Sequence, residues 1–322
     1  MKEKILLPFT AFILLTSIVG CSTGTTTNQD VSRENQVTAH DHNLNEQENV
    51  EEQKERTEKQ IHDNSIDFKG VKLPKEAMEL FDTAVNDAKA DASNVEPLFK
   101  ELLSWLEKNA SASIGFYMNY IEINKMLGYP EDTHPYELLK ILNNDLLKNP
   151  DEVTNKEFKN KLIMIANNGL MFRTAEGDFE PTINFGYLLD KYDDILSEEM
   201  KEYLQIRASN SNIYDEESII ASYSQLAKNV IDVERFLTKY NESDMRTVVK
   251  NIYANVLASY LLAGQTKAEM KTIYESFLEE YHGSETHAYM IIDDFYKLLR
   301  ENNFKYNDEV YKYINITIDQ VR

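Results

Sequence analysis

Apolar residues recur at the spacing of an α-helix from Phe68 to the end of the chain, and this pattern limits the fold more than any other feature. The first stripe follows Pro74, which stands where a first helical turn accepts proline, and consists of Ala77, Leu80, Phe81, Ala84, Val85 and Ala88. No stretch shows a convincing alternation of apolar and polar residues with the period of two that a half-buried strand needs. The sequence therefore predicts an all-α fold.

Capping residues, glycines and prolines divide this pattern into about ten to twelve helices. Two capping boxes give clear helix starts, Thr154 with Glu157 and Thr266 with Glu269, because each pair satisfies backbone amides of a first turn. Other signals predict helix starts at Thr133, Asp215, Ser243, Ser284 and Asn307, and helix ends at Gly128, Pro150, Gly264 and Gly283. Helices joined by short loops favour stacked antiparallel hairpins, in a solenoid-like or an irregular array.

The first twenty residues have the composition of an export signal. Lys2 and Lys4 precede an apolar run, residues 5–19, which is shorter than the roughly 20 residues that span a bilayer. Residues 18–21 read Ile-Val-Gly-Cys and resemble the lipobox of bacterial lipoproteins. The resemblance implies that Cys21 becomes the first mature residue and carries a diacylglycerol thioether, which anchors the protein at the outer face of the cytoplasmic membrane, as in Gram-positive lipoproteins. An ordinary secretory signal followed by an unrelated cysteine is the alternative.

Residues 22–66 differ sharply from the rest of the chain in composition. They contain no aromatic residue, few large apolar ones and many threonines, asparagines, glutamines and glutamates. Such a segment buries too little apolar surface to offset the entropy lost on ordering. The predicted organisation is a signal peptide at 1–20, a disordered acidic tether at 21–66 and an all-α extracytoplasmic domain at 67–322.

The charge and the cysteine content exclude several classes of protein. The formal net charge is −21, which argues against a nucleic-acid binder, because affinity for phosphate needs clustered cations. The acidic domain favours a cationic protein or peptide as partner. One cysteine forms no internal disulfide and no cysteine-rich metal site, and lipidation at Cys21 would leave no thiol for catalysis. The sequence predicts no cofactor.

One segment interrupts the helical pattern, residues 169–186. Its polar residues alternate with phenylalanines, and a loop of this length is often functional or mobile. It could form a short hairpin or a folded lid. The candidate binding residues in it are Arg173, Glu176, Asp178, Glu180 and Asn184.

The composition of this loop allows two chemical uses and one structural one. Three acidic residues at alternate positions resemble the start of a calcium loop, but Pro181 stands where an EF-hand needs glycine and Tyr187 where it needs glutamate. We therefore predict no metal site and favour a structural loop with Arg173 paired internally. Two carboxylates could also serve acid–base chemistry, which keeps an exported hydrolase or lyase as an alternative.

Part of the domain is similar to an uncharacterised group of Gram-positive surface lipoproteins. The residues that carry this resemblance are Glu176-Gly177, Pro181, Asn184, Tyr187, Tyr192, Leu196-Ser197 and Glu234-Arg235-Phe236-Leu237. The resemblance implies a fold and a location, and it implies no activity.

The 19 tyrosines all lie at Tyr117 or later, mostly on apolar stripes, so we interpret them as core residues in preference to a recognition surface. Taken together, the sequence predicts a lipid-anchored, non-enzymatic module that binds a protein or peptide. A structural or immunity-type lipoprotein without a small ligand is the remaining alternative.

Overall fold

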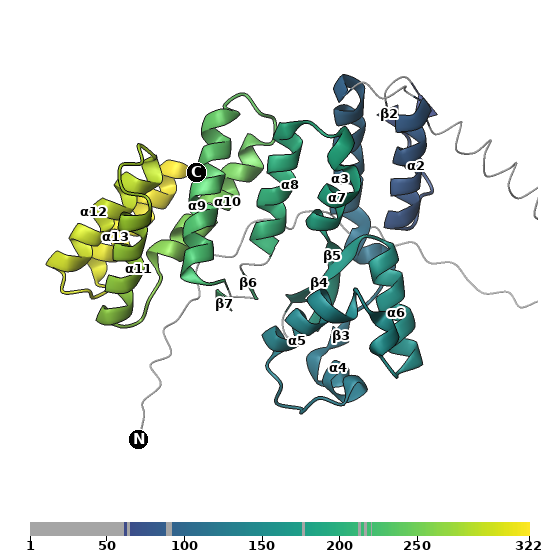
Figure 1. Cartoon of the computed structure of the whole chain (residues 1–322), viewed down its shortest axis with the longest axis horizontal. Helices are drawn as coiled ribbons and strands as arrows, with labels where there is room; N and C mark the ends of the chain where they lie inside the picture. The colour runs from purple at the N-terminus through teal and green to yellow at the C-terminus, as the bar shows by residue number, and fades with distance from the viewer. Residues whose placement is uncertain are drawn as a thin grey trace, which may run out of the picture. The chain divides into compact units, whose positions relative to one another are not determined.

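The computed structural model describes residues 61–62, 65–87, 92–175, 178–211, 214–215, 218–219 and 221–322. This part of the chain is mostly helical, with twelve α-helices and one three-stranded sheet (Figure 1). The all-α prediction is confirmed. The predicted signal peptide, Cys21, Glu176 and most of the predicted tether lie outside the described residues.

The N-terminal part of the described chain combines helices with the sheet. Its elements are β1 (Ile61–His62), β2 (Ser65–Ile66), α2 (Pro74–Asp87), α3 (Ala92–Ile114), β3 (Met118–Asn119), α4 (Tyr120–Leu127), α5 (Pro135–Ile141), a π-helical turn (Leu142–Leu146), α6 (Lys156–Asn167), β4 (Leu170–Ala175), β5 (Asp178–Ile183) and α7 (Phe185–Tyr192). Strands β3 and β4 both pair antiparallel with β5, which packs against α3. Ile66 already belongs to the hydrophobic core, so packing begins within the last residues of the predicted tether, 21–66.

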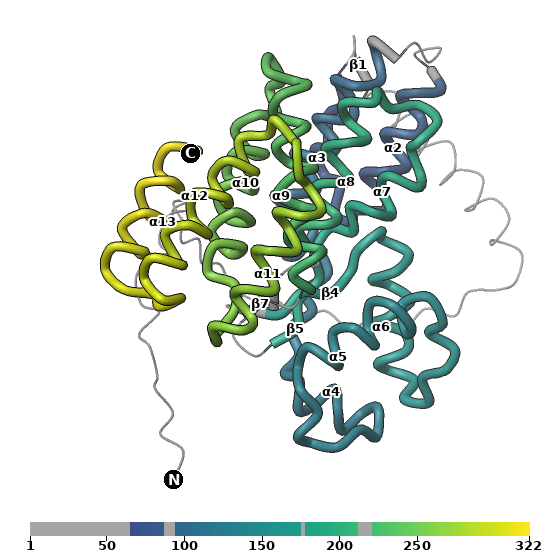
Figure 2. Tube along the Cα trace, turned by 60° about the vertical axis from the view of Figure 1, so that its left-hand side comes forward, coloured from purple at the N-terminus to yellow at the C-terminus, as the bar shows by residue number. Residues whose placement is uncertain are grey.

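The C-terminal part is an array of helices. Its elements are α8 (Glu198–Ser211), β6 (Tyr214–Asp215), β7 (Ser218–Ile219), α9 (Tyr223–Lys239), α10 (Arg246–Leu261), α11 (Lys267–Glu280), α12 (His287–Glu301) and α13 (Asp308–Val321). Helix α9 contacts α8, α10, α11 and α12, while α10 also contacts α13 (Figure 2). Helix-on-helix packing of this kind agrees with the predicted helical array.

Several predicted helix boundaries are confirmed. Thr266 and Glu269 form a capping box at the start of α11, and the side chain of Asn307 accepts a hydrogen bond from a first-turn amide of α13. Gly128 ends α4 with φ of 73°, a left-handed conformation that favours glycine. These signals are local, which explains why the sequence reveals them.

Other predicted starts are displaced along the chain. The capping residues are Asn155 in place of Thr154, Thr286 in place of Ser284, His134 in place of Thr133 and Ser222 in place of Asp215. Helix α10 begins at Arg246, and the Ser243 hydroxyl accepts a hydrogen bond from the amide just before it. The largest displacement has a clear cause: residue 215 belongs to the short strand β6, while Ser222 and Gln225 form a capping box of their own.

The buried carboxylate of Glu234 connects α9 to α12. It accepts hydrogen bonds from the backbone amides of His287 and of Ala288, the latter at 2.8 Å. These are the first two amides of α12, which have no partner within their own helix. The positive end of the helix dipole also stabilises the carboxylate charge.

Two tyrosine hydroxyls satisfy carbonyl groups at the end of α10. The hydroxyl of Tyr306 donates to the carbonyl oxygen of Leu261 at 3.0 Å, and that of Tyr274 donates to the carbonyl oxygen of Tyr260 at 3.1 Å. The interpretation of the tyrosines as core residues is confirmed for six of the nineteen, which are buried: Tyr192, Tyr203, Tyr253, Tyr260, Tyr274 and Tyr296. Burial raises the pKa of Tyr306 from its ordinary value to about 12.

These buried hydroxyls predict a loss of stability in alkali. An unfolded chain releases the Tyr306 proton near pH 10, whereas the folded protein holds it until about pH 12. The stability that this group contributes is complete below pH 10 and is lost as the pH rises towards 12. We expect the melting temperature, followed by circular dichroism, to fall across this window.

The variant Tyr306→Phe separates this group from the other tyrosines. It removes a buried hydrogen bond, so we expect a free energy of unfolding lower by about 1 kcal/mol at pH 7 and a shallower decline above pH 10. Tyr129→Phe, at an exposed position, is the matched control and should change neither quantity. An alkaline decline as steep as that of the unmodified protein would contradict the assignment.

Candidate functional site

The described residues of the predicted binding loop, Arg173, Asp178, Glu180 and Asn184, lie on strands β4 and β5 and just after β5 (Figure 1). Arg173 is on β4 directly opposite Glu180 on β5, and Asp178 begins β5. Asn184 follows β5 and precedes α7. The segment is therefore a sheet hairpin, one of the two forms that its alternating pattern allowed.

Glu180 is the centre of this cluster and is 4% exposed. Its carboxylate forms an ion pair with the Arg173 guanidinium and accepts a hydrogen bond from the Tyr117 hydroxyl at 2.6 Å. The Ser111 hydroxyl lies 3.5 Å from the same oxygen. The hydrogen bond to Glu180 also raises the pKa of Tyr117. The predicted internal pairing of Arg173 is confirmed: Arg173 contacts one oxygen of the Glu180 carboxylate, and the Tyr117 hydroxyl bonds to the other.

Asp178 and Asn184 make separate local contacts. The Asp178 carboxylate accepts a hydrogen bond from the Asn119 side chain at 3.3 Å, which joins β5 to β3. The Asn184 side chain caps α7 by accepting from the amide of Tyr187 at 3.0 Å. Arg173 and Glu180 are thus brought together, whereas Asp178 and Asn184 each stabilise a different element.

A side chain satisfies the backbone groups of one residue at the outer edge of this sheet. Strand β4 is an edge strand, and Asn143 in the π-helical turn bonds to both backbone groups of Phe172. The Asn143 amide nitrogen donates to the Phe172 carbonyl oxygen at 2.9 Å, and its oxygen accepts from the Phe172 amide at 2.8 Å. At Phe172 the edge therefore has no free backbone group to offer to another chain.

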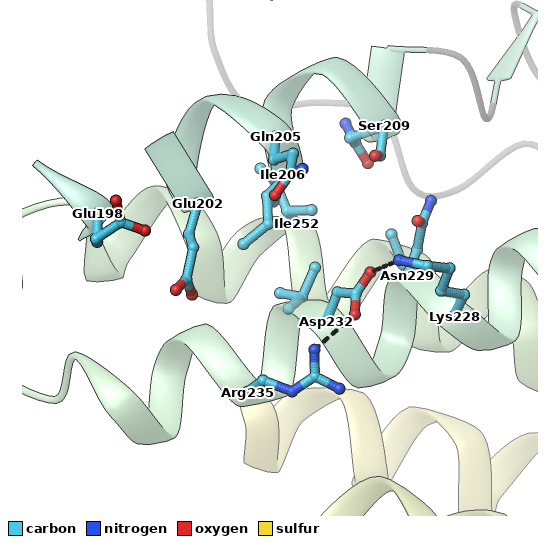
Figure 3. A pocket seen from close by; sticks show the side chains of 13 residues that line it. Glu198, Glu202, Gln205, Ile206, Ser209, Lys228, Asn229, Asp232, Arg235 and Ile252 are labelled. Carbon is cyan, nitrogen blue, oxygen red and sulfur yellow. Dashed lines mark hydrogen bonds and ion pairs between the residues drawn. The ribbon is translucent and has the colours of Figure 1, made fainter. Parts of the chain in front are cut away.

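A pocket of about 430 Å³ lies elsewhere, between α8 and α9, where the sequence predicts no site. Its apolar lining comes from four buried residues: Ile206, Val233, Ile252 and Val256. Polar residues of α8 and α9 line it from opposite sides (Figure 3). We call this feature the groove. An apolar floor with a few polar groups is typical of ligand sites.

Each carboxylate that lines the groove is paired with a cation, and for Glu198 and Glu202 that cation, Lys201 or Lys239, lies outside the lining. Asp232 binds Lys228 and also Arg235, the latter at 3.0 Å, and Figure 3 shows it between these two cations. Glu202 accepts a hydrogen bond from Lys239 at 2.6 Å, which raises the lysine pKa. Glu198 lies on the same side of α8 as Glu202 (Figure 3).

Neutral polar groups complete the groove lining: Gln205, Ser209, Asn210 and Asn229. The side-chain oxygen of Asn210 is buried and has no hydrogen-bond partner within the part of the chain that the structure describes. A buried acceptor without a partner costs about 1–3 kcal/mol. Positions 198, 202, 205 and 209 share one face of a helix, and this spacing is the sequence signal for the groove.

Comparison with models of protein families, with curated proteins and with solved structures finds no match. The resemblance to Gram-positive surface lipoproteins therefore stays a prediction. Across the described ranges, no group of three or more histidine, cysteine, aspartate or glutamate residues is placed to hold a metal ion. No helix there is both long and apolar enough to cross a membrane.

The hairpin contacts predict that Glu180 acts on stability. Replacing its carboxylate in Glu180→Gln weakens a buried charge-assisted cluster, so we expect the free energy of unfolding to fall by about 1–3 kcal/mol. Asp178→Asn is the matched control and should cost less than about 0.5 kcal/mol, because that carboxylate is less buried and makes one long hydrogen bond. Urea denaturation measures both. A Glu180→Gln protein as stable as the unmodified one would refute the structural role.

Proposed function

We propose that the protein is a lipid-anchored, extracytoplasmic binding module that holds an extended peptide in the groove between α8 and α9. The observation that carries this proposal is the row of side-chain amides over an apolar floor, which includes Asn210, whose side-chain oxygen has no partner among the described residues. The groove volume of about 430 Å³ falls in the range of ligand pockets.

The amide side chains match the chemistry of a peptide backbone. Gln205, Asn210 and Asn229 each offer both a donor and an acceptor, as every non-proline residue of a bound peptide does. From Glu198 to Ser209 the helix rises about 16 Å, a length that about five extended residues cover. The apolar floor would receive side chains on one side of such a peptide.

The pairing of acidic groups favours binding over catalysis. Asp232 is held between two cations, and Glu202 is bonded to Lys239. In the alternative site, around residues 169–186, Glu180 is engaged by Arg173 and Tyr117. A general acid or base must reach the substrate proton that it transfers, and these carboxylates are occupied by protein partners. We therefore propose a non-enzymatic role.

The location in this proposal rests on the lipobox-like residues 18–21. Two acyl chains on Cys21 would supply the hydrophobic burial that stable anchoring needs, since one chain gives marginal binding. The acidic character of residues 67–322 favours a cationic protein or peptide over a nucleic acid as partner.

The anchor is tested by replacing the cysteine. In Cys21→Ala no thioether can form, so we expect the full chain to shift from the membrane fraction to the medium or the soluble fraction. Fractionation with immunoblotting measures the distribution, and incorporation of labelled palmitate measures lipidation. The substitution Ser22→Ala, one residue away, is the control and should leave both unchanged. Retention of the Cys21→Ala protein in the membrane fraction would contradict the proposal of a lipid anchor at Cys21.

The groove is tested with a library of random dodecapeptides displayed on phage. Peptides selected on the full chain are then measured by fluorescence anisotropy. Because Ser209 lies on the α8 side of the groove, Ser209→Trp should obstruct it and weaken binding of the selected peptides at least tenfold. Ser276→Trp introduces the same side chain at an exposed position of α11 and should have no effect. Equal affinities for both variants would place the peptides elsewhere.

A further inference from the structure

We infer that the groove selects an uncharged peptide segment with aliphatic side chains, because every charged side chain that the structure places in its lining already has a partner of opposite charge within the protein. This inference rests on the proposed function and specifies the ligand of the same site. Three features support it: the ion pairs of the two walls, the composition of the floor and the alternation of side chains in an extended peptide.

The charges of the α9 wall are balanced within that helix. Asp232 forms ion pairs with Lys228 and with Arg235, which lie four residues before it and three residues after it. Side chains at these spacings are neighbours on a helix surface, so the pairs do not depend on a ligand. A charged ligand group at this wall would have to displace one of these partners or lose its hydration without gaining a new one.

The carboxylates of the α8 wall are also paired. Lys239 donates to Glu202 at 2.6 Å, and the hydroxyl of Tyr240 donates to the same oxygen at 3.2 Å. The Glu198 carboxylate lies 3.3 Å from the Lys201 ammonium. Because Lys239 and Tyr240 stand at the end of α9, their bonds also hold the two walls together. Neither carboxylate can bind a cationic ligand without sharing or losing its present partner.

The groove is therefore nearly balanced in charge, although the chain as a whole is strongly acidic. Its lining holds three carboxylates and two cations, and Lys201 and Lys239 add their charges from just outside it. The formal net charge of the chain is −21, so its surface outside the groove still favours a cationic partner. Such a partner would place an uncharged segment in the groove and keep its basic residues outside it.

The floor of the groove consists of β-branched aliphatic side chains. Ile206 comes from α8, Val233 from α9, and Ile252 and Val256 from α10. The χ1 torsions of such side chains are restricted, so the floor is a stiff apolar surface. An aliphatic ligand side chain that packs on it gains free energy by leaving water, whereas a charged side chain in the same place loses its hydration without a partner.

An extended peptide would direct alternate side chains at this floor. Successive side chains of a strand point to opposite faces, so two residues separated by one face the floor, and the residue between them faces the solvent. About five extended residues cover the length of α8 that lines the groove. The preferred ligand therefore contains two aliphatic residues separated by one residue of any type.

The test uses blocked heptapeptides with isoleucine at the third and fifth positions and serine elsewhere. Lysine or glutamate replaces the third residue in one pair of peptides and the fourth residue in another pair. Fluorescence anisotropy with the full chain measures each affinity. We expect both charged residues to weaken binding at least tenfold at the third position and less than twofold at the fourth. Affinity for the parent peptide should change less than twofold between about 0.05 and 0.5 M sodium chloride, because no ion pair with the ligand contributes to it.

Removal of one carboxylate makes the test specific. In Asp232→Asn, Lys228 and Arg235 lose their shared partner. We expect the peptide with glutamate at the third position to bind this variant at least fivefold more tightly than the unmodified protein, a gain that loss of folding cannot produce. Asp293→Asn removes the carboxylate of a similar pair with Lys297 on α12, outside the groove, and should leave every affinity unchanged.

The outcomes separate this inference from the proposed function. A preference for lysine over glutamate at the third position, or no gain for the glutamate peptide with Asp232→Asn, would overturn the inference while the peptide groove itself stands. Library peptides that are sensitive to Ser209→Trp but lack two aliphatic residues separated by one would do the same. Failure of all the heptapeptides to bind, together with a library that yields no peptide sensitive to Ser209→Trp, would remove both.

Discussion

The carboxylate of Glu234 fixes the helix on which the groove depends. It lies on the buried side of α9 and accepts hydrogen bonds from the first two backbone amides of α12. These bonds hold α9 against α12. A buried carboxylate without such donors would be strongly unfavourable, and a helix start without an acceptor would leave amides unbonded. Each group therefore needs the other in one relative position. The opposite side of α9 can then present Asn229 and Asp232 at a constant spacing from α8.

The same principle recurs where elements meet. Asn143 bonds to both backbone groups of Phe172 in the edge strand β4, and the hydroxyl of Tyr306 donates to a carbonyl group at the end of α10. Glu180 accepts from donors on β4 and from the segment between α3 and β3. In each case a polar side chain of one element forms a hydrogen bond or an ion pair with a backbone group or a charged side chain of another element. These contacts specify which elements meet, while the apolar core supplies most of the stability.

The sequence predicted those features whose signals are local. The capping box of Thr266 and the left-handed Gly128 depend on neighbouring residues alone, and both are confirmed. A hairpin was one of two forms expected for residues 169–186, but burial in strand β5 does not alternate strictly, because Phe179, Glu180 and Pro181 are buried in succession. Its burial comes from α3 and the flanking strands, and period alone cannot report such tertiary contacts. The pairing of Arg173 with an acidic residue of the same segment was predictable because both lie close in sequence.

The sequence did not predict the groove because the composition of its lining is that of an ordinary exposed helix face. A polar stripe such as Glu202, Gln205 and Ser209 is what any solvent-exposed helix face carries, and only the approach of α9 gives it a second wall. The hairpin, by contrast, has an unusual composition, yet its charged groups bind one another. Unusual composition marks where a fold needs special contacts. The groove brings several amide side chains together over an apolar floor, and among them is Asn210, whose buried side-chain oxygen has no hydrogen-bond partner among the described residues.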